Sequence, residues 1–174
     1  MNRNGWPVCS GIRTLAALVV GRKGTVYYGD GAALRSLDPT GRVLWTHDPV
    51  QLENNNAPAL ASDGTIYFGD GHEVRALNSA TGRQRWVVEV PGHVISQPAV
   101  GADGTVYATT TGPYDVGGST PPYLAPRLYA IDKSGRKMWA LKNRQHVYAS
   151  AVIGRNRTIY FATSDGVLYA IGER

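Results

Sequence analysis

The sequence predicts an all-β fold, a β-propeller of about four blades with four antiparallel strands in each. The composition of 21 Gly, 10 Pro and 10 Tyr in 174 residues indicates many tight turns between short, aromatic-bearing strands. A sequence marker also recurs along the chain: GTVYY at 24–28, GTIYF at 64–68, GTVY at 104–107 and RTIYF at 157–161. The first three copies begin 40 residues apart, which is the repeat length of a propeller blade.

The clearest copy of the repeat spans residues 57–90. Four strand segments, APALAS, TIYFG, EVRALN and RQRWVVEV, are separated by short turns that contain glycine. The chain is therefore predicted to be a single propeller domain over 1–174, and the blade-like units are listed here: 14–50, 54–92, 94–144 and 147–174.

Two segments depart from this repeat. Residues 111–126, TGPYDVGGSTPPYLAP, account for the longer third interval and are predicted to be a loop inserted between two strands. This loop is either a recognition element or a tolerated surface insertion. Residues 1–10 are a candidate closing strand, because Asn4-Gly5-Trp6 offers the glycine and tryptophan that mark other fourth strands.

The number of repeats leaves three arrangements open. The chain is a closed four-bladed ring, a half propeller that dimerises into an eight-bladed ring, or a fragment of a longer propeller.

The residue inventory excludes several classes of protein. Cys9 is the only cysteine, so there is no intrachain disulfide, and no Cys or His pair has a zinc-site spacing. No apolar run is long enough for a transmembrane segment, and no signal peptide is recognised. No nucleophile elbow and no phosphate-binding glycine loop is present, so hydrolases and nucleotide enzymes have no support.

The repeat resembles the quinoprotein-type (PQQ-like) β-propeller family, which includes PQQ-dependent alcohol dehydrogenases and BamB-like outer-membrane assembly propellers. Its tryptophan-docking motif resembles residues 76–86, ALNSATGRQRW, with Asn78 where aspartate is usual. The resemblance implies structural docking roles for Trp45, Trp86 and Trp139. It also implies an extracytoplasmic location, in the periplasm or cell envelope of a bacterium.

The expected function is a non-catalytic binding or scaffold module for a protein or polymer partner. The alternative is a fragment or subunit of a PQQ-dependent oxidoreductase, and only this alternative implies PQQ with calcium. Such an enzyme needs calcium ligands, a catalytic aspartate and in many members adjacent cysteines, whereas the aspartates here mostly precede turn glycines. No cofactor, no metal site and no catalytic residue is therefore expected.

Candidate binding residues lie where one unit leads into the next. His93 and His146 each follow their unit's tryptophan by seven residues, and Glu53 lies in the same register. Gln97 and Tyr148 follow on the same connections. These side chains either face a common ligand at the mouth of the channel or form local hydrogen bonds within loops.

A basic rim is predicted on the outer strands. The net charge is +5, and Arg42, Arg83 and Arg136 each follow a turn glycine. Such a rim either binds an anionic partner or prevents edge-to-edge aggregation. Nucleic acid is not expected as a partner, because no aromatic residues are interleaved with these arginines.

Overall fold

The computed structural model describes residues 18–29, 33–48, 57–112, 125–143 and 145–172. The described residues form strands, turns and connecting segments and contain no helix. No segment of this part of the chain therefore qualifies as a membrane-spanning helix. The predicted all-β fold of short antiparallel strands is confirmed.

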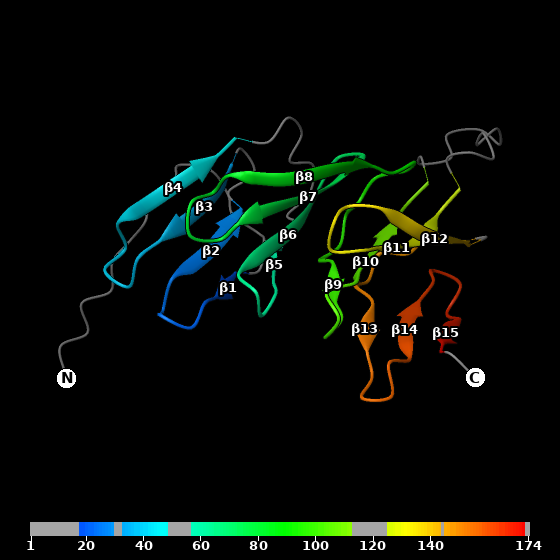
Figure 1. Cartoon of the computed structure of the whole chain (residues 1–174). Coiled ribbons are helices and arrows are strands. Elements are labelled where there is room, and N and C mark those ends of the chain that lie inside the picture. The colour runs from blue at the N-terminus through cyan, green and yellow to red at the C-terminus, as the bar shows by residue number, and fades with distance from the viewer. Residues whose placement is uncertain (1–17, 30–32, 49–56, 113–124, 144, 173–174) are drawn as a thin grey trace.

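Four antiparallel sheets follow one another along the chain, and we call them units 1 to 4 (Figure 1). Unit 1 contains β1 (Val19–Val20), β2 (Val26–Gly29), β3 (Leu34–Leu37) and β4 (Val43–His47). Unit 2 contains β5 (Ala59–Leu60), β6 (Thr65–Asp70), β7 (Glu73–Asn78) and β8 (Gln84–Glu89). Unit 3 contains β9 (Ala99–Val100), β10 (Val106–Thr110), β11 (Arg127–Ile131) and β12 (Lys137–Lys142). Unit 4 contains β13 (Val152–Ile153), β14 (Ile159–Ala162) and β15 (Leu168–Ile171).

The first turn of each unit ends where the recurring marker begins. In unit 2, Asp63 Oδ1 accepts a hydrogen bond from the Thr65 amide (2.9 Å), and Gly64 adopts a φ of +79°. In unit 4 the glycine position is occupied by Arg157, the one non-glycine residue with a positive φ (63°) in the described part of the chain. A residue with a Cβ is disfavoured in this conformation, so the fourth turn is more strained than its counterparts.

The units stack face to face through apolar side chains. Tyr27 and Trp45 of unit 1 lie in one cluster with Ile66 and Phe68 of unit 2. The same faces meet between the other units: Tyr67 packs with Val106 and Ile131, and Tyr107 packs with Ile159 and Phe161. Units 1 to 3 therefore each turn their tyrosine-bearing face toward the next unit along the chain.

Two tryptophans connect neighbouring units by hydrogen bonds. Trp45 Nε1 donates to the Ser79 carbonyl (2.9 Å), and Trp86 Nε1 donates to the Lys133 carbonyl (2.9 Å). Trp139 is 38% exposed and packs on Tyr107 of its own sheet (ring centroids 6.0 Å apart).

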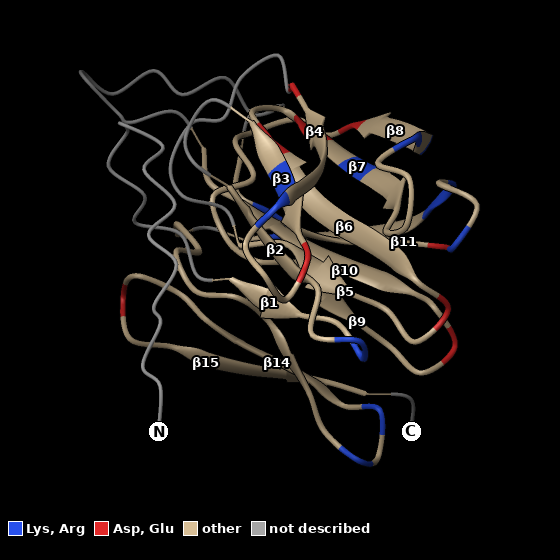
Figure 2. Cartoon of the chain, turned by 90° about the vertical axis from the view of Figure 1, so that its left-hand side faces the viewer, with Lys and Arg blue, Asp and Glu red and all other residues tan. Residues whose placement is uncertain are grey.

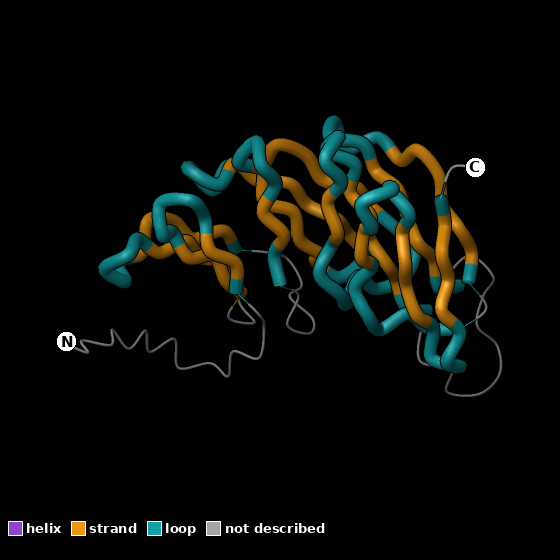
Figure 3. Tube along the Cα trace, turned by 90° about the horizontal axis from the view of Figure 1, so that it is seen from below, coloured by secondary structure: helices purple, strands orange, loops and turns teal. Residues whose placement is uncertain are grey.

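The four units form a fan in which units 1 and 4 lie at opposite ends (Figures 1 and 3). No sheet of the described residues closes on itself. The candidate closing strand at 1–10 and most of the 111–126 loop lie outside the described residues. Charged residues are concentrated in turns and on a few strands (Figure 2).

Candidate functional site

One edge of the fan is built by the segments that connect the units, and we call it the connection face. It contains the β6–β7 turn, the segments 90–98 and 145–151, and the β14–β15 turn. Backbone hydrogen bonds join these pieces: Val90 N to His72 O (2.7 Å), Val94 N to Gly71 O (2.8 Å) and Ser164 N to His146 O (2.9 Å). The face is therefore held by main-chain contacts from several strands.

His93 lies on this face beside a second histidine. Its backbone forms an antiparallel bridge with Thr111, with hydrogen bonds of 3.1 and 2.9 Å. Its ring contacts that of His72, with centroids 4.1 Å apart and planes inclined by 50°. His72 Nδ1 in turn lies 3.0 Å from the Gly92 carbonyl oxygen. Sequence reasoning missed His72, because it stands in a turn where the other units have no histidine.

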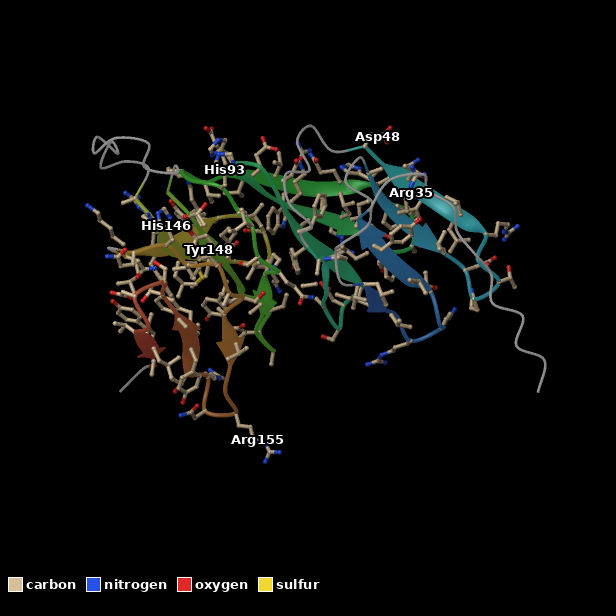
Figure 4. All side chains as sticks on the ribbon, turned by 180° about the vertical axis from the view of Figure 1, so that it is seen from behind. Arg35, Asp48, His93, His146, Tyr148 and Arg155 are labelled. Atoms are coloured by element: carbon tan, nitrogen blue, oxygen red, sulfur yellow. The ribbon has the colours of Figure 1, made fainter. Side chains whose placement is uncertain are left out.

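His146 pairs with a different aromatic residue. Its ring stacks on Tyr148, with centroids 5.7 Å apart and planes inclined by 22°, and Tyr148 is 48% exposed. Figure 4 shows His93, His146 and Tyr148 in the same half of the molecule, with Arg155 at the far edge. His93 and His146 thus share a face but make their ring contacts with separate partners.

Gln97 has a structural contact rather than an exposed amide. Its Nε2 donates to the Pro58 carbonyl (2.7 Å), which ties the start of unit 3 to unit 2. The neighbouring Ser96 hydroxyl is buried and lies 2.5 Å from Thr109 Oγ1. Glu53, the remaining candidate of this group, lies outside the described residues.

A buried ion-pair network lies on β6 and β7 of unit 2. Arg75 Nε approaches Asp70 Oδ2 (2.8 Å), while Arg75 Nη2 donates to Glu73 Oε2 (2.6 Å). The side chains of Asp70 and Arg75 are only 1% and 11% exposed. The adjacent His47 ring meets Phe68 edge-on, and burial together with the nearby Arg75 charge lowers the pKa of His47. This network holds charge in unit 2, beside His47 of unit 1.

The three arginines of the predicted basic rim are not equivalent. Arg42 Nε lies 3.2 Å from Asp38 Oδ2, and Arg136 Nε lies 3.0 Å from Asp132 Oδ2, within their own turns. Hydrogen bonds from the Thr40 hydroxyl and from the backbone amides of the turn, together with the Arg42 charge, lower the pKa of Asp38 to about 2. Arg83 has Asn78 at the corresponding position and so lacks a matching carboxylate. Two of the three charges are therefore partly neutralised where they stand.

Two grooves between units open at the edge opposite the connection face. The larger, of about 670 Å³, lies between units 1 and 2 and has Arg22 and Lys23 beside an apolar floor that includes Tyr27. A groove of about 370 Å³ between units 3 and 4 carries Arg155 and Arg157. The turns GRKGT and GRNRT differ in charge from SDGT and ADGT of the middle units, so the sequence itself marks the two basic grooves.

Unit 4 presents an exposed apolar sheet face. Val152 pairs with Tyr160, and Ala162 pairs with Leu168, so these residues line one side of the sheet. Val152 is 60% exposed and Leu168 is 69% exposed. Within the described residues, β15 is also an edge strand.

The described residues contain no group of three or more His, Cys, Asp or Glu side chains arranged to hold a metal ion.

Comparisons with known proteins bear on the fold. The family model described as outer membrane protein assembly factor BamB matches residues 29–174. BamB from Moraxella catarrhalis has a TM-score of 0.67 and 17% identity, with 91% of this chain and 48% of that chain covered. The computationally designed Ika4 protein has a TM-score of 0.68 and 18% identity, with 92% and 93% covered. Quinohemoprotein alcohol dehydrogenase from Comamonas testosteroni has a TM-score of 0.67 and 17% identity, with 90% and 34% covered.

The chain thus spans about half the length of that BamB structure. At these identities the solved structures show a shared fold and leave the activity open. No curated protein matches the chain.

Proposed function

Because the chain belongs to the PQQ-like propeller family described as outer membrane protein assembly factor BamB, we propose that it is a non-catalytic module that binds a protein partner. The family description also supports an extracytoplasmic location, where assembly factors of the outer membrane act.

The observation that carries the proposal is the exposed apolar face of unit 4. Tyr160 occupies the sequence position of Tyr27, Tyr67 and Tyr107, whose faces each pack against the next unit. In unit 4 the same face carries Leu168 and Val152 at 69% and 60% exposure. Burying such side chains is favourable by about 1.5–3 kcal/mol each.

The shape of this face favours a protein as the partner. Its counterparts in units 1 to 3 are covered by a second β-sheet that contributes Ile, Phe and Val side chains. A partner with a similar apolar sheet face would cover this surface in the same way. A partner with a free strand could instead pair with the β15 edge. A second copy of the chain is one such protein, and two four-unit chains contain eight units.

Site-specific photo-crosslinking tests the proposal. A photoreactive residue replaces Leu168, and the matched control carries it at Met138, which is 51% exposed on the outer strand β12. We expect a discrete protein adduct from position 168 in cells that express the chain, and none from position 138. Equal labelling at both positions, or no adduct at position 168, overturns the proposal.

Light scattering of the purified chain then distinguishes the partners. A mass near twice 18.7 kDa that returns to the monomer value in Leu168→Asp identifies a second copy. A monomer with a heterologous adduct identifies another protein.

The enzyme alternative has its own measurement. Addition of PQQ and calcium, followed by assays of saturable binding and dye-linked alcohol oxidation, is expected to give no turnover. Saturable binding with turnover replaces the binding-module proposal with an oxidoreductase.

A further inference from the structure

The connection face holds two histidines on separate segments that the fold brings together. His72 stands in the tight turn between β6 and β7, and His93 stands in the segment that leads to unit 3. Their ring centroids are 4.1 Å apart. We propose that His72 and His93 bind one divalent transition-metal ion, with Cu²⁺ or Ni²⁺ favoured over Zn²⁺.

The His72 ring is set in the tautomer that a metal requires. A carbonyl oxygen can only accept, so the 3.0 Å contact with Gly92 O makes Nδ1 of His72 the donor. The proton of the neutral ring is then on Nδ1, which leaves the Nε2 lone pair available for coordination. Metal-binding histidines commonly donate their second ring N–H to a backbone carbonyl in this way.

The backbone around the pair is fixed before any ion arrives. Val90 N and Val94 N donate to the carbonyl oxygens of His72 and Gly71, and the backbone of His93 is paired with Thr111. Gly69 lies so close to Val94 that an added Cβ meets Val94 Cγ1 at 2.4 Å. Ligands on a backbone held in this manner lose little conformational entropy on binding, which favours affinity.

The ring separation indicates which metals fit. A metal–nitrogen bond is about 2.1 Å, which places a ring centroid about 3.2 Å from the ion. When each ring directs one nitrogen at a shared ion, centroids 4.1 Å apart correspond to an angle of about 80° at that ion. This angle is nearer the right angle of tetragonal Cu²⁺ and Ni²⁺ sites than the tetrahedral angle of Zn²⁺. The described residues offer no third His, Cys, Asp or Glu ligand beside the pair, so we expect water in the remaining positions.

The test is Cu²⁺ titration by calorimetry in a weakly coordinating buffer, with Cys9→Ser as the background because a thiolate also binds copper. The chain has four histidines, so single variants separate them. We expect one Cu²⁺ per chain with micromolar affinity. His72→Ala and His93→Ala should each weaken binding by about tenfold or more. His146→Ala is the control and should bind as the background does.

Two further measurements distinguish a loss of metal binding from a loss of folding. His72 is exposed, so His72→Ala should unfold at the background temperature, and His93→Gln provides a second, less disruptive variant of the half-buried partner. Electron paramagnetic resonance of bound Cu²⁺ should show two coordinated nitrogens in the background and fewer in each variant. Background-like affinity in either the His72 or the His93 variant, or an equal loss in His146→Ala, overturns the site. An affinity for Zn²⁺ above that for Ni²⁺ overturns the metal preference.

Discussion

The hydrogen bond from Trp86 to the next unit provides the sharpest test of how the units are held together. Trp86→Phe removes the 2.9 Å bond to the Lys133 carbonyl, which is worth about 0.5–1.5 kcal/mol. It also removes the second ring of the half-buried indole, which packs against the apolar cluster between units 2 and 3, at a cost of about 1 kcal/mol. The expected loss in the free energy of unfolding is about 2 kcal/mol.

Thermal unfolding followed by circular dichroism measures this loss. For a chain of this size, about 2 kcal/mol corresponds to a fall in Tm of about 4–8 °C. Trp139→Phe is the matched control, because Trp139 is 38% exposed and no described residue accepts a hydrogen bond from its indole. We expect the control to lose less than about half as much. An equal loss in both variants refutes the view that the bond to the next unit stabilises the stack.

Three other predictions follow from single contacts. Asp70→Asn should lower the free energy of unfolding by about 2–4 kcal/mol in urea titrations, since it leaves the arginine partner buried with less compensation; a change below about 1 kcal/mol contradicts this. Gly69→Ala should cost at least about 1–3 kcal/mol because its Cβ collides with Val94, and wild-type stability would exclude the collision. The hydrogen bond from the Thr40 hydroxyl holds the pKa of Asp38 at about 2, below its value in the unfolded chain. The carboxylate therefore stabilises the fold above about pH 4. This contribution is lost as the pH falls toward 2, so NMR titration of Asp38 should give a midpoint near 2, and a midpoint near 4 contradicts the contact.

The strands can be predicted from the sequence because each is defined by a short residue pattern that recurs from unit to unit. The marker at 64–68 overlaps β6, and the segment EVRALN coincides with β7. The strand pairing can also be predicted, because a short turn can join two neighbouring strands only when they are antiparallel. The number of units that close around an axis cannot be predicted in this way. It depends on small rotations between units that no residue of the repeat specifies.

The site was only partly predictable for a related reason. His93 and His146 were found because they occupy equivalent positions, and equivalence places them on one face. His93 contacts His72, whereas His146 stacks on Tyr148. Sequence spacing does not show these contacts, because they depend on the directions of side chains in loops. Gln97 was expected at a channel mouth, but its donation to Pro58 is a contact between units that sequence spacing does not show.

Departures from the repeat carry more functional information than the repeat itself. Tyr67 and Trp86 recur because every unit must pack against its neighbour, so their presence indicates stacking. His72 has no counterpart in the other units, and stacking does not require it, since its ring is exposed. Yet its turn is joined to segment 90–94 by two backbone bonds and its own Nδ1 contact. The metal ion proposed above would give this exposed side chain, which its Nδ1 contact holds in a defined orientation, a role beyond packing.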